Sequence, residues 1–252
     1  MYDFQKANTW KRISAALFDF IMLVMVVMGV AYLMSTVINY TSYFTEYENH
    51  RTQYGEKYGI DFKISAEEYN ALPEDERAVY DEASKEFSKD AEVNKTYAML
   101  LNLTLVIAIF SILISYLLLE FLVPLLFKNG QTLGKKIFGI GVMRIDGVRL
   151  TPFLLFVRSI LGKYTIETMI PVFCAVMIYF NSMVAAAVMV IGILLIVQLG
   201  LLIANRERTP IHDKLASTVT VDLTSQMIFA TVEDLLAYKE KKAKEAAERA
   251  EY

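Results

Sequence analysis

Cysteine and histidine are scarce in this chain of 252 residues. The one cysteine, Cys174, lies inside an apolar run, so no internal disulfide and no cysteine metal cluster is possible. The two histidines are His50 and His212. Asp213 follows His212, but no further ligands are spaced for a metal. A hydrogen-bonded histidine that fixes a turn is therefore favoured over a metal or acid/base pair, and we predict no metal and no cofactor.

Motifs of enzymes are also missing. No nucleophile elbow or zinc-binding helix motif occurs. Residues 130–136 (GQTLGKK) resemble a phosphate-binding loop, but the glycine spacing is one residue short and Lys136 stands where Ser or Thr is required. We interpret this segment as a turn that brings Lys135 and Lys136 to lipid headgroups. The sequence predicts no enzymatic activity, no nucleotide site and no nucleic-acid partner.

Long apolar runs, in contrast, are abundant. Hydrophobic residues make up 55% of the chain, and about 20 apolar residues suffice for a helix to span a bilayer. The first run is too long for a signal-peptide core and no small-residue cleavage site follows it, which indicates a retained span. Asn181 and Ser182 alone separate the last two runs, which predicts a helical hairpin. The four predicted spans are residues 13–38, 98–127, 164–181 and 183–204.

Charge predicts the orientation of these spans. Residues 39–97 carry 14 acidic and 7 basic residues, whereas residues 128–163 carry seven basic residues and one acid. The positive-inside rule then places both termini and residues 128–163 in the cytosol, and residues 39–97 outside the cell membrane. The predicted parts are the N-terminus with the first span (1–38), an acidic loop (39–97), the second span (98–127), a basic segment (128–163), the third and fourth spans (164–204) and a charged tail (205–252).

Local signals predict further structure outside the spans. Ser65 to Glu68 is a capping-box pattern, and Pro73 followed by three acids marks a second helix start. Asp146-Gly147 between two strand-like runs, within residues 140–151, predicts a β hairpin, to which residues 219–223 would add a third strand.

Residues 152–163 are amphipathic, which predicts a helix lying on the inner interface, and residues 233–252 predict an exposed charged helix. The predicted fold is thus an all-α multi-pass membrane protein with four transmembrane helices, a small cytosolic β hairpin and an extracytoplasmic helical insertion.

Three acids lie within the spans or at their ends. Asp19 is the only ionisable residue of residues 13–38, and Glu120 and Glu167 occupy the second and third spans. At about 1.5 Å per residue, all three lie within roughly 10 Å of the predicted inner surface. A pair of acids in a low dielectric would have a raised pKa and could carry a proton. Alternatively, an arginine or lysine neutralises each acid, which would give a structural cluster.

Five sequence blocks closely resemble the RDD family of membrane proteins. Each block occurs in the family's order along the chain, and the resemblance covers residues 10–38 and 98–223. The family is named for an arginine and two aspartates, and the motif match assigns these to Arg12, Asp19 and Asp213. The blocks are Arg12, Asp19, the GQTLGK run that contains Gly130, Gln131, Gly134 and Lys135, the IGVMRIDG run at 140–147, and the RTPIHDKLASTV run that contains His212 and Asp213.

Two functions follow as hypotheses. The resemblance implies transport, and cation/proton exchange is proposed for some family members; Asp19, Glu120 and Glu167 would then bind the ion or proton. Alternatively, the protein is a non-transporting scaffold or regulatory subunit. Toward the outside the spans offer only isolated hydroxyl, amide and phenol groups, which commonly join helices. Because one chain of four spans leaves little room for a polar path, we expect a homo-oligomer or a membrane protein partner.

Overall fold

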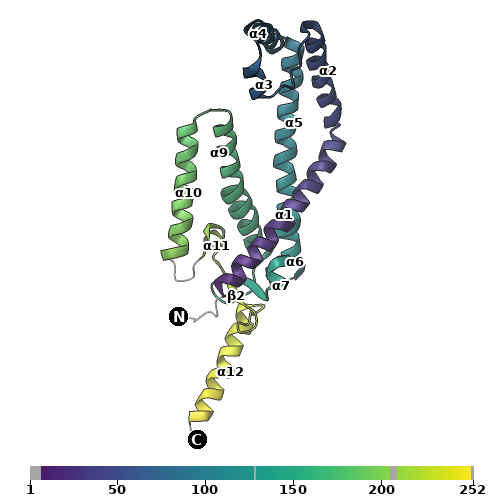
Figure 1. The fold of residues 1–252 in the computed structure, drawn as a ribbon. Coiled ribbons are helices and arrows are strands. Elements are labelled where there is room, and N and C mark those ends of the chain that lie inside the picture. Colours follow the sequence, from purple (N-terminus) through teal and green to yellow (C-terminus); the bar gives the residue numbers. More distant parts are fainter. Residues whose placement is uncertain (1–6, 128, 205–208, 251–252) are drawn as a thin grey trace. The chain divides into compact units, whose positions relative to one another are not determined.

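The computed structural model describes residues 7–127, 129–204 and 209–250. Lys128 and Arg208, which entered the charge and motif arguments, lie outside the described residues. The elements in order are α1 (Thr9–Val37), α2 (Tyr40–Tyr58), α3 (Ala66–Ala71), α4 (Glu74–Lys89), α5 (Ala91–Tyr116), η1 (Leu117–Leu122), α6 (Val123–Phe127), α7 (Leu133–Ile137), β1 (Ile140–Arg144), α8 (Pro152–Phe156), η2 (Val157–Met169), α9 (Ile170–Tyr179), α10 (Val184–Ala204), α11 (Ile211–Leu215), β2 (Thr218–Asp222) and α12 (Val232–Ala250), where η denotes a π-helix (Figure 1).

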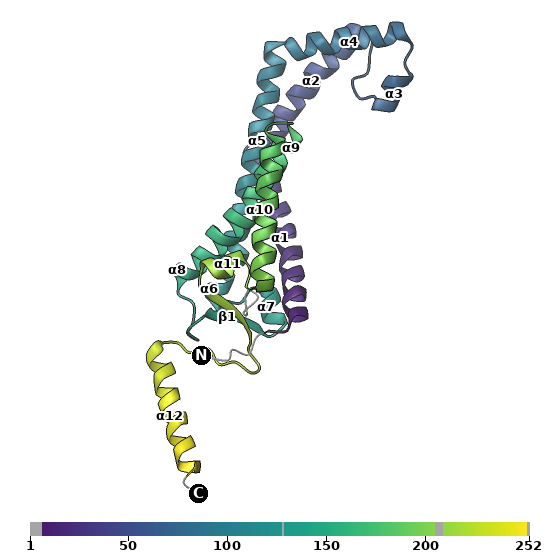
Figure 2. The ribbon, with the colours of Figure 1, turned by 90° about the vertical axis from the view of Figure 1, so that its left-hand side faces the viewer.

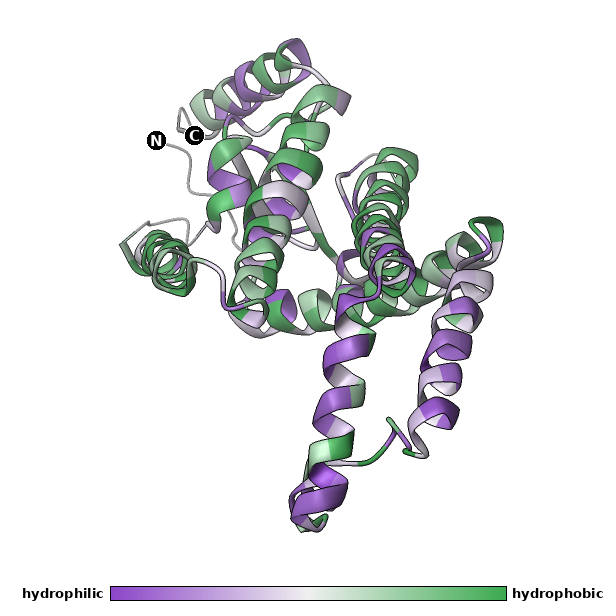
Figure 3. Ribbon diagram, turned by 90° about the horizontal axis from the view of Figure 1, so that it is seen from above, coloured by the Kyte–Doolittle hydropathy of each residue, from purple (hydrophilic) through white to green (hydrophobic). Residues whose placement is uncertain are grey.

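The described residues contain four helices that are long and apolar enough to cross a membrane, as predicted. These are Thr9–Val37, Ala91–Phe127, Pro152–Tyr179 and Val184–Ala204. They are mostly hydrophobic, whereas the helices of the insertion between the first two are mostly hydrophilic (Figure 3). The chain forms two compact units, Met28–Ser111 and the remainder, Met1–Val27 with Ile112–Tyr252.

The unit Met28–Ser111 contains the acidic insertion, and aromatic rings hold its helices together. Phe87 of α4 packs against Tyr54 of α2 and against Phe62, with ring centroids 5.4 Å and 5.3 Å apart. The predicted capping box is confirmed: Glu68 N donates to Ser65 Oγ, and Ser65 N donates to the Glu68 carboxylate.

The predicted helix start after Pro73 is also confirmed, since α4 begins at Glu74. α4 does not continue into the second span. It ends at Lys89, and Asp90 then accepts a hydrogen bond from Glu92 N in the first turn of α5. α4 is therefore a helix separate from that of the second span.

The second and third spans each contain a π-helical section that ends just before a proline. η1 precedes Pro124, and η2 precedes Pro171 in α9. Proline lacks the N–H that an α-helix needs, and a widened turn accommodates its ring and the freed carbonyls. The Thr168 hydroxyl donates to the carbonyl of Lys163, five residues earlier, at 2.9 Å. Each π-helical section thus ends two residues before a proline.

The third span begins earlier than predicted. We expected residues 152–163 to form a separate interfacial helix, but α8, η2 and α9 form one continuous helix over Pro152–Tyr179. Arg158 within it is almost completely buried, so its charge lies inside the protein. The predicted hairpin of the last two spans is confirmed. α9 ends at Tyr179 and α10 begins at Val184, and the turn contains Asn181 with a positive φ, which asparagine tolerates.

The small sheet differs from the predicted hairpin. β1 pairs antiparallel with β2, from Ile140 opposite Asp222 to Arg144 opposite Thr218. The Asp146-Gly147 turn does form, but beyond it the chain makes a single bridge to β1, Met143 to Arg149. Arg149 N donates instead to the carbonyl of Phe229. The segment predicted as a third strand is therefore the main partner of β1, and in the described residues the sheet has two strands.

The sheet and three short helices lie together at one end of the α9–α10 hairpin. Figure 2 shows β1, α7, α8 and α11 grouped there. Met143, Val219 and Val221 form a buried core that Ile228 covers. This group of elements carries the three motif blocks that follow the second and fourth spans, and it brings them against α1, η1 and η2.

Candidate functional site

Among the described residues, Asp19 binds the start of a short helix and forms no ion pair with a basic side chain. Its Oδ1 atom accepts a hydrogen bond from Gly134 N at 2.8 Å, and its Oδ2 atom accepts one from the Thr132 hydroxyl. Thr132 is the N-cap of α7, and a carboxylate at a helix N-terminus is favourably placed for the helix dipole. A Cβ atom at Gly134 would lie 3.0 Å from the Asp19 carboxyl carbon, so glycine permits this approach.

Two further span residues bind the first turn of α11 in a similar way. The Gln198 side chain of α10 accepts from Ile211 N at 3.0 Å, and Glu167 accepts from His212 N at 3.1 Å. Glu167 also contacts the ring of His212, with 2.8 Å between Oε2 and Nδ1. The prediction of a hydrogen-bonded histidine that fixes the turn after the last span is thus confirmed.

Asp213 is buried against an arginine. Its Oδ1 atom lies 2.7 Å from Arg158 Nε, and Thr218 donates to the same oxygen at 2.8 Å. Burial alone would raise the pKa of Asp213. The Arg158 guanidinium and His212 together lower it by more, so the pKa is held well below its usual range. Burial lowers the pKa of His212 despite the neighbouring Asp213, which favours a neutral ring at pH 7.

Glu120 forms the other buried ion pair. Its Oε2 atom lies 2.6 Å from Lys163 Nζ, and both side chains are largely buried. Glu120 lies in η1, whereas Arg158, Lys163 and Glu167 lie in η2. The charged residues that the second and third spans contribute therefore come from π-helical turns, which are often found at functional sites.

Lys135 differs from the prediction. We expected it to reach lipid headgroups with Lys136, but Lys135 is buried and only Lys136 is exposed. The Lys135 ammonium donates to the Thr132 hydroxyl at 3.3 Å. Burial lowers the pKa of Lys135 to about 7, with further lowering by Lys163 and Arg158, and Glu120 and Asp19 offset only part of this.

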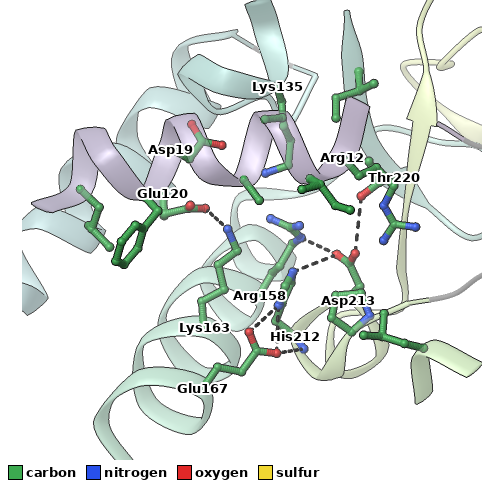
Figure 4. Close-up of a pocket in the computed structure, with 18 of the residues that line it drawn as sticks. Arg12, Asp19, Glu120, Lys135, Arg158, Lys163, Glu167, His212, Asp213 and Thr220 are labelled. Atoms are coloured by element: carbon green, nitrogen blue, oxygen red, sulfur yellow. Dashed lines mark hydrogen bonds and ion pairs between the residues drawn. The ribbon is translucent and has the colours of Figure 1, made fainter. Parts of the chain in front are cut away.

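These side chains line one cavity of about 830 Å³. Figure 4 shows them converging from α1, η1, α7, η2 and α11. The charged and titratable lining residues are Arg12, Asp19, Glu120, Lys135, Arg158, Lys163, Glu167, His212 and Asp213. Among the described residues, no three His, Cys, Asp or Glu side chains are arranged to hold a metal ion.

The structure brings together most of the site residues that were predicted from the sequence. Asp19, Glu120 and Glu167 line the same cavity as predicted, with the motif residues Arg12, Lys135, His212 and Asp213. Two motif residues act on the backbone instead. Gly130 has a positive φ of 60°, and Gln131 donates to the carbonyl of Ile140 at 2.9 Å. The threonines that bind the two aspartates, Thr132, Thr218 and Thr220, were not predicted, although they lie within or beside the motif blocks.

The fold and the site define a multi-pass helical membrane protein with a buried cluster of charges where its spans meet a small sheet. The RDD family model matches residues 6–217, and the chain belongs to the RDD family. The comparisons with curated proteins and with solved structures gave no significant match. The family match ends at Ser217, the residue before β2, so Thr218 and Thr220, which contact Asp213, lie just outside it.

Proposed function

We propose that the protein exchanges a monovalent cation for a proton across the cell membrane, with Asp19 and Glu120 as the carboxylates that face the moving ion. The observation that carries the proposal is their common cavity. They come from different spans, and both line the large cavity and a smaller one beside it. Ionisable groups inside membranes commonly mark ion pathways and proton relays.

The Glu120–Lys163 pair suggests how the exchange works. A cation that enters beside the Glu120 carboxylate competes with the ammonium 2.6 Å away. If the site releases a proton as the cation binds, its charge stays constant. One cation is then exchanged for one proton. Glu167 and His212 form a second hydrogen-bonded pair on the same cavity, through which a proton can reach or leave it.

Sodium flux into vesicles, driven by a pH gradient, tests this function. Wild type is expected to move sodium, and Asp19→Asn and Glu120→Gln are expected to reduce the rate at least about tenfold, which corresponds to about 1.4 kcal/mol. Asparagine keeps the oxygen that accepts from Gly134 N, so Asp19→Asn separates charge from folding. Glu86→Gln is the control, because Glu86 pairs with Lys57 in the insertion. Equal flux in wild type and Asp19→Asn, or no flux of sodium, lithium or potassium in wild type, contradicts the proposal.

One observation favours the alternative function, a scaffold or regulatory subunit. Each carboxylate of the cluster already has a partner: Asp19 has backbone and threonine donors, Glu120 has Lys163, Glu167 has His212 and Asp213 has Arg158. Carboxylates that are all paired in this way are expected of a structural cluster that binds no transported ion. A pull-down in mild detergent distinguishes the two: a stoichiometric partner supports the scaffold, and a purified homo-oligomer alone counts against it.

We further propose a homo-oligomer with both termini and the charge cluster in the cytosol. Few residues of α1 and α10 are buried within the chain, which leaves apolar faces for another copy. The basic inner segment supports the orientation. With Cys174 replaced by serine, cysteines introduced at Lys89 and Lys241 should react with a membrane-impermeant maleimide from opposite sides. Labelling of both from one side contradicts the orientation.

A further inference from the structure

Lys135 is buried, and no carboxylate of the described residues forms an ion pair with it. Its side chain is 8% exposed. In the part of the chain that the structure describes, no carboxylate oxygen lies within ion-pair distance of its ammonium, and the Thr132 hydroxyl is its hydrogen-bond acceptor. Removing an ammonium from water costs several kcal/mol unless an opposite charge is close. Lys135 therefore loses its proton or gains an anion.

The nearby acids are already bound elsewhere. Asp19 accepts from Thr132 and Gly134, and Glu120 pairs with Lys163. Two cations, Lys163 and Arg158, lie close enough to lower the pKa of Lys135. Glu120 and Asp19 offset only part of this effect, so Lys135 experiences a surplus of positive charge that an entering anion would relieve.

The cavity also has an apolar rim. Ile13 and Phe20 of α1 and Ile203 of α10 line it, and they are 51%, 60% and 82% exposed. In a bilayer, side chains exposed on spanning helices face acyl chains. A volume of about 830 Å³ also falls within the range of small-molecule sites. A free anion would contact only the charged residues around Lys135. An amphiphile would contact both these charged residues and the apolar rim.

We propose that this cavity binds the headgroup of an anionic phospholipid, with the phosphate against the Lys135 ammonium and the acyl chains along the apolar rim of α1 and α10. Basic pockets between transmembrane helices are known to hold such headgroups. The proposal goes beyond the proposed function, because the lipid site exists whether or not the protein moves ions.

Native mass spectrometry of the full chain in neutral detergent tests the lipid site. Phosphatidylglycerol and phosphatidylcholine with identical acyl chains are titrated separately. Wild type is expected to retain phosphatidylglycerol at least about tenfold more tightly, a difference of about 1.4 kcal/mol. Lys135→Gln should abolish this preference, and Lys135→Arg should retain it. Lys136→Gln is the matched control, since it removes the adjacent exposed lysine.

Three outcomes overturn the proposal. Wild type shows no preference between the two lipids, or Lys136→Gln loses the preference as fully as Lys135→Gln. The third outcome is that inorganic phosphate stabilises wild type against heat as much as phosphatidylglycerol does, which would identify the ligand as a free anion. If Lys135→Gln fails to fold, the wild-type preference and its retention in Lys135→Arg still decide the matter. None of these measurements depends on ion flux.

Discussion

Arg158 Nε lies 2.7 Å from Asp213 Oδ1, and the two side chains are 2% and 1% exposed. The pair joins the third span to the segment after the fourth, two parts of the chain that are 55 residues apart. Thr218 and Thr220 donate to the two Asp213 oxygens from β2. Asp213 is thus the point where a span, a short helix and the sheet meet.

Asp213→Asn should destabilise the protein by about 3–5 kcal/mol, because it leaves the buried Arg158 charge without a counter-charge. Asparagine keeps an oxygen that can accept from Thr218. The loss in unfolding free energy therefore measures the effect of removing the charge. Equilibrium unfolding in mixed micelles with increasing SDS measures it. Asp222→Asn is the control: its partner Lys11 is 40% exposed, and removing such a pair costs less than about 1 kcal/mol. Equal losses in both variants would show that the burial of the Arg158 pair has no special effect.

Gly134→Ala should destabilise by about 1–3 kcal/mol, the usual cost of overpacking. The new methyl group would meet the Ala15 carbonyl and lie 3.0 Å from the Asp19 carboxyl carbon, which forces α7 away from α1. The same unfolding measurement applies. At Gly192 in α10 an added Cβ meets nothing within 4 Å, so Gly192→Ala should be neutral or slightly stabilising. A neutral Gly134→Ala would refute the close approach of α7 and α1.

Stability in neutral detergent should rise as the pH increases from about 7 toward 10. In the folded protein the pKa of Lys135 is about 7, whereas an unfolded lysine keeps its proton to about 10.4. Between these values the unfolded state binds more protons, so the free energy of unfolding increases with pH, by at most about 1.4 kcal/mol per unit. Lys135→Met should reduce this slope and Lys136→Met should not. An unchanged slope in Lys135→Met would show that another group is responsible.

The elements that the sequence predicted correctly depend on local signals. Apolar runs locate the four membrane-spanning helices, and the capping box at Ser65 locates α3. The grouping of Asp19, Glu120 and Glu167 was also predictable, because distance from a span end depends only on helix rise.

The partners of the acids were not predictable, because they depend on how each helix is rotated. Pro124 and Pro171 each follow an acid, Glu120 and Glu167, by four residues. This spacing could have predicted widened helical turns at the two acids. It could not have predicted which side chains the acids contact. Lys135 and Lys136 look alike in the sequence, and only the packing of α7 buries one of them. The strand that pairs with β1 lies more than 70 residues away, so a local turn signal favoured the wrong pairing.

The capping of α7 and α11 by span residues has a mechanical consequence. Asp19, Glu167 and Gln198 belong to three different spans, and each holds a backbone amide of a short helix beyond the spans. None of these spans can tilt or slide relative to α7 or α11 without breaking such a bond. Since β1 and β2 follow α7 and α11 directly, a displacement of any of these spans is transmitted as a push or pull on the sheet.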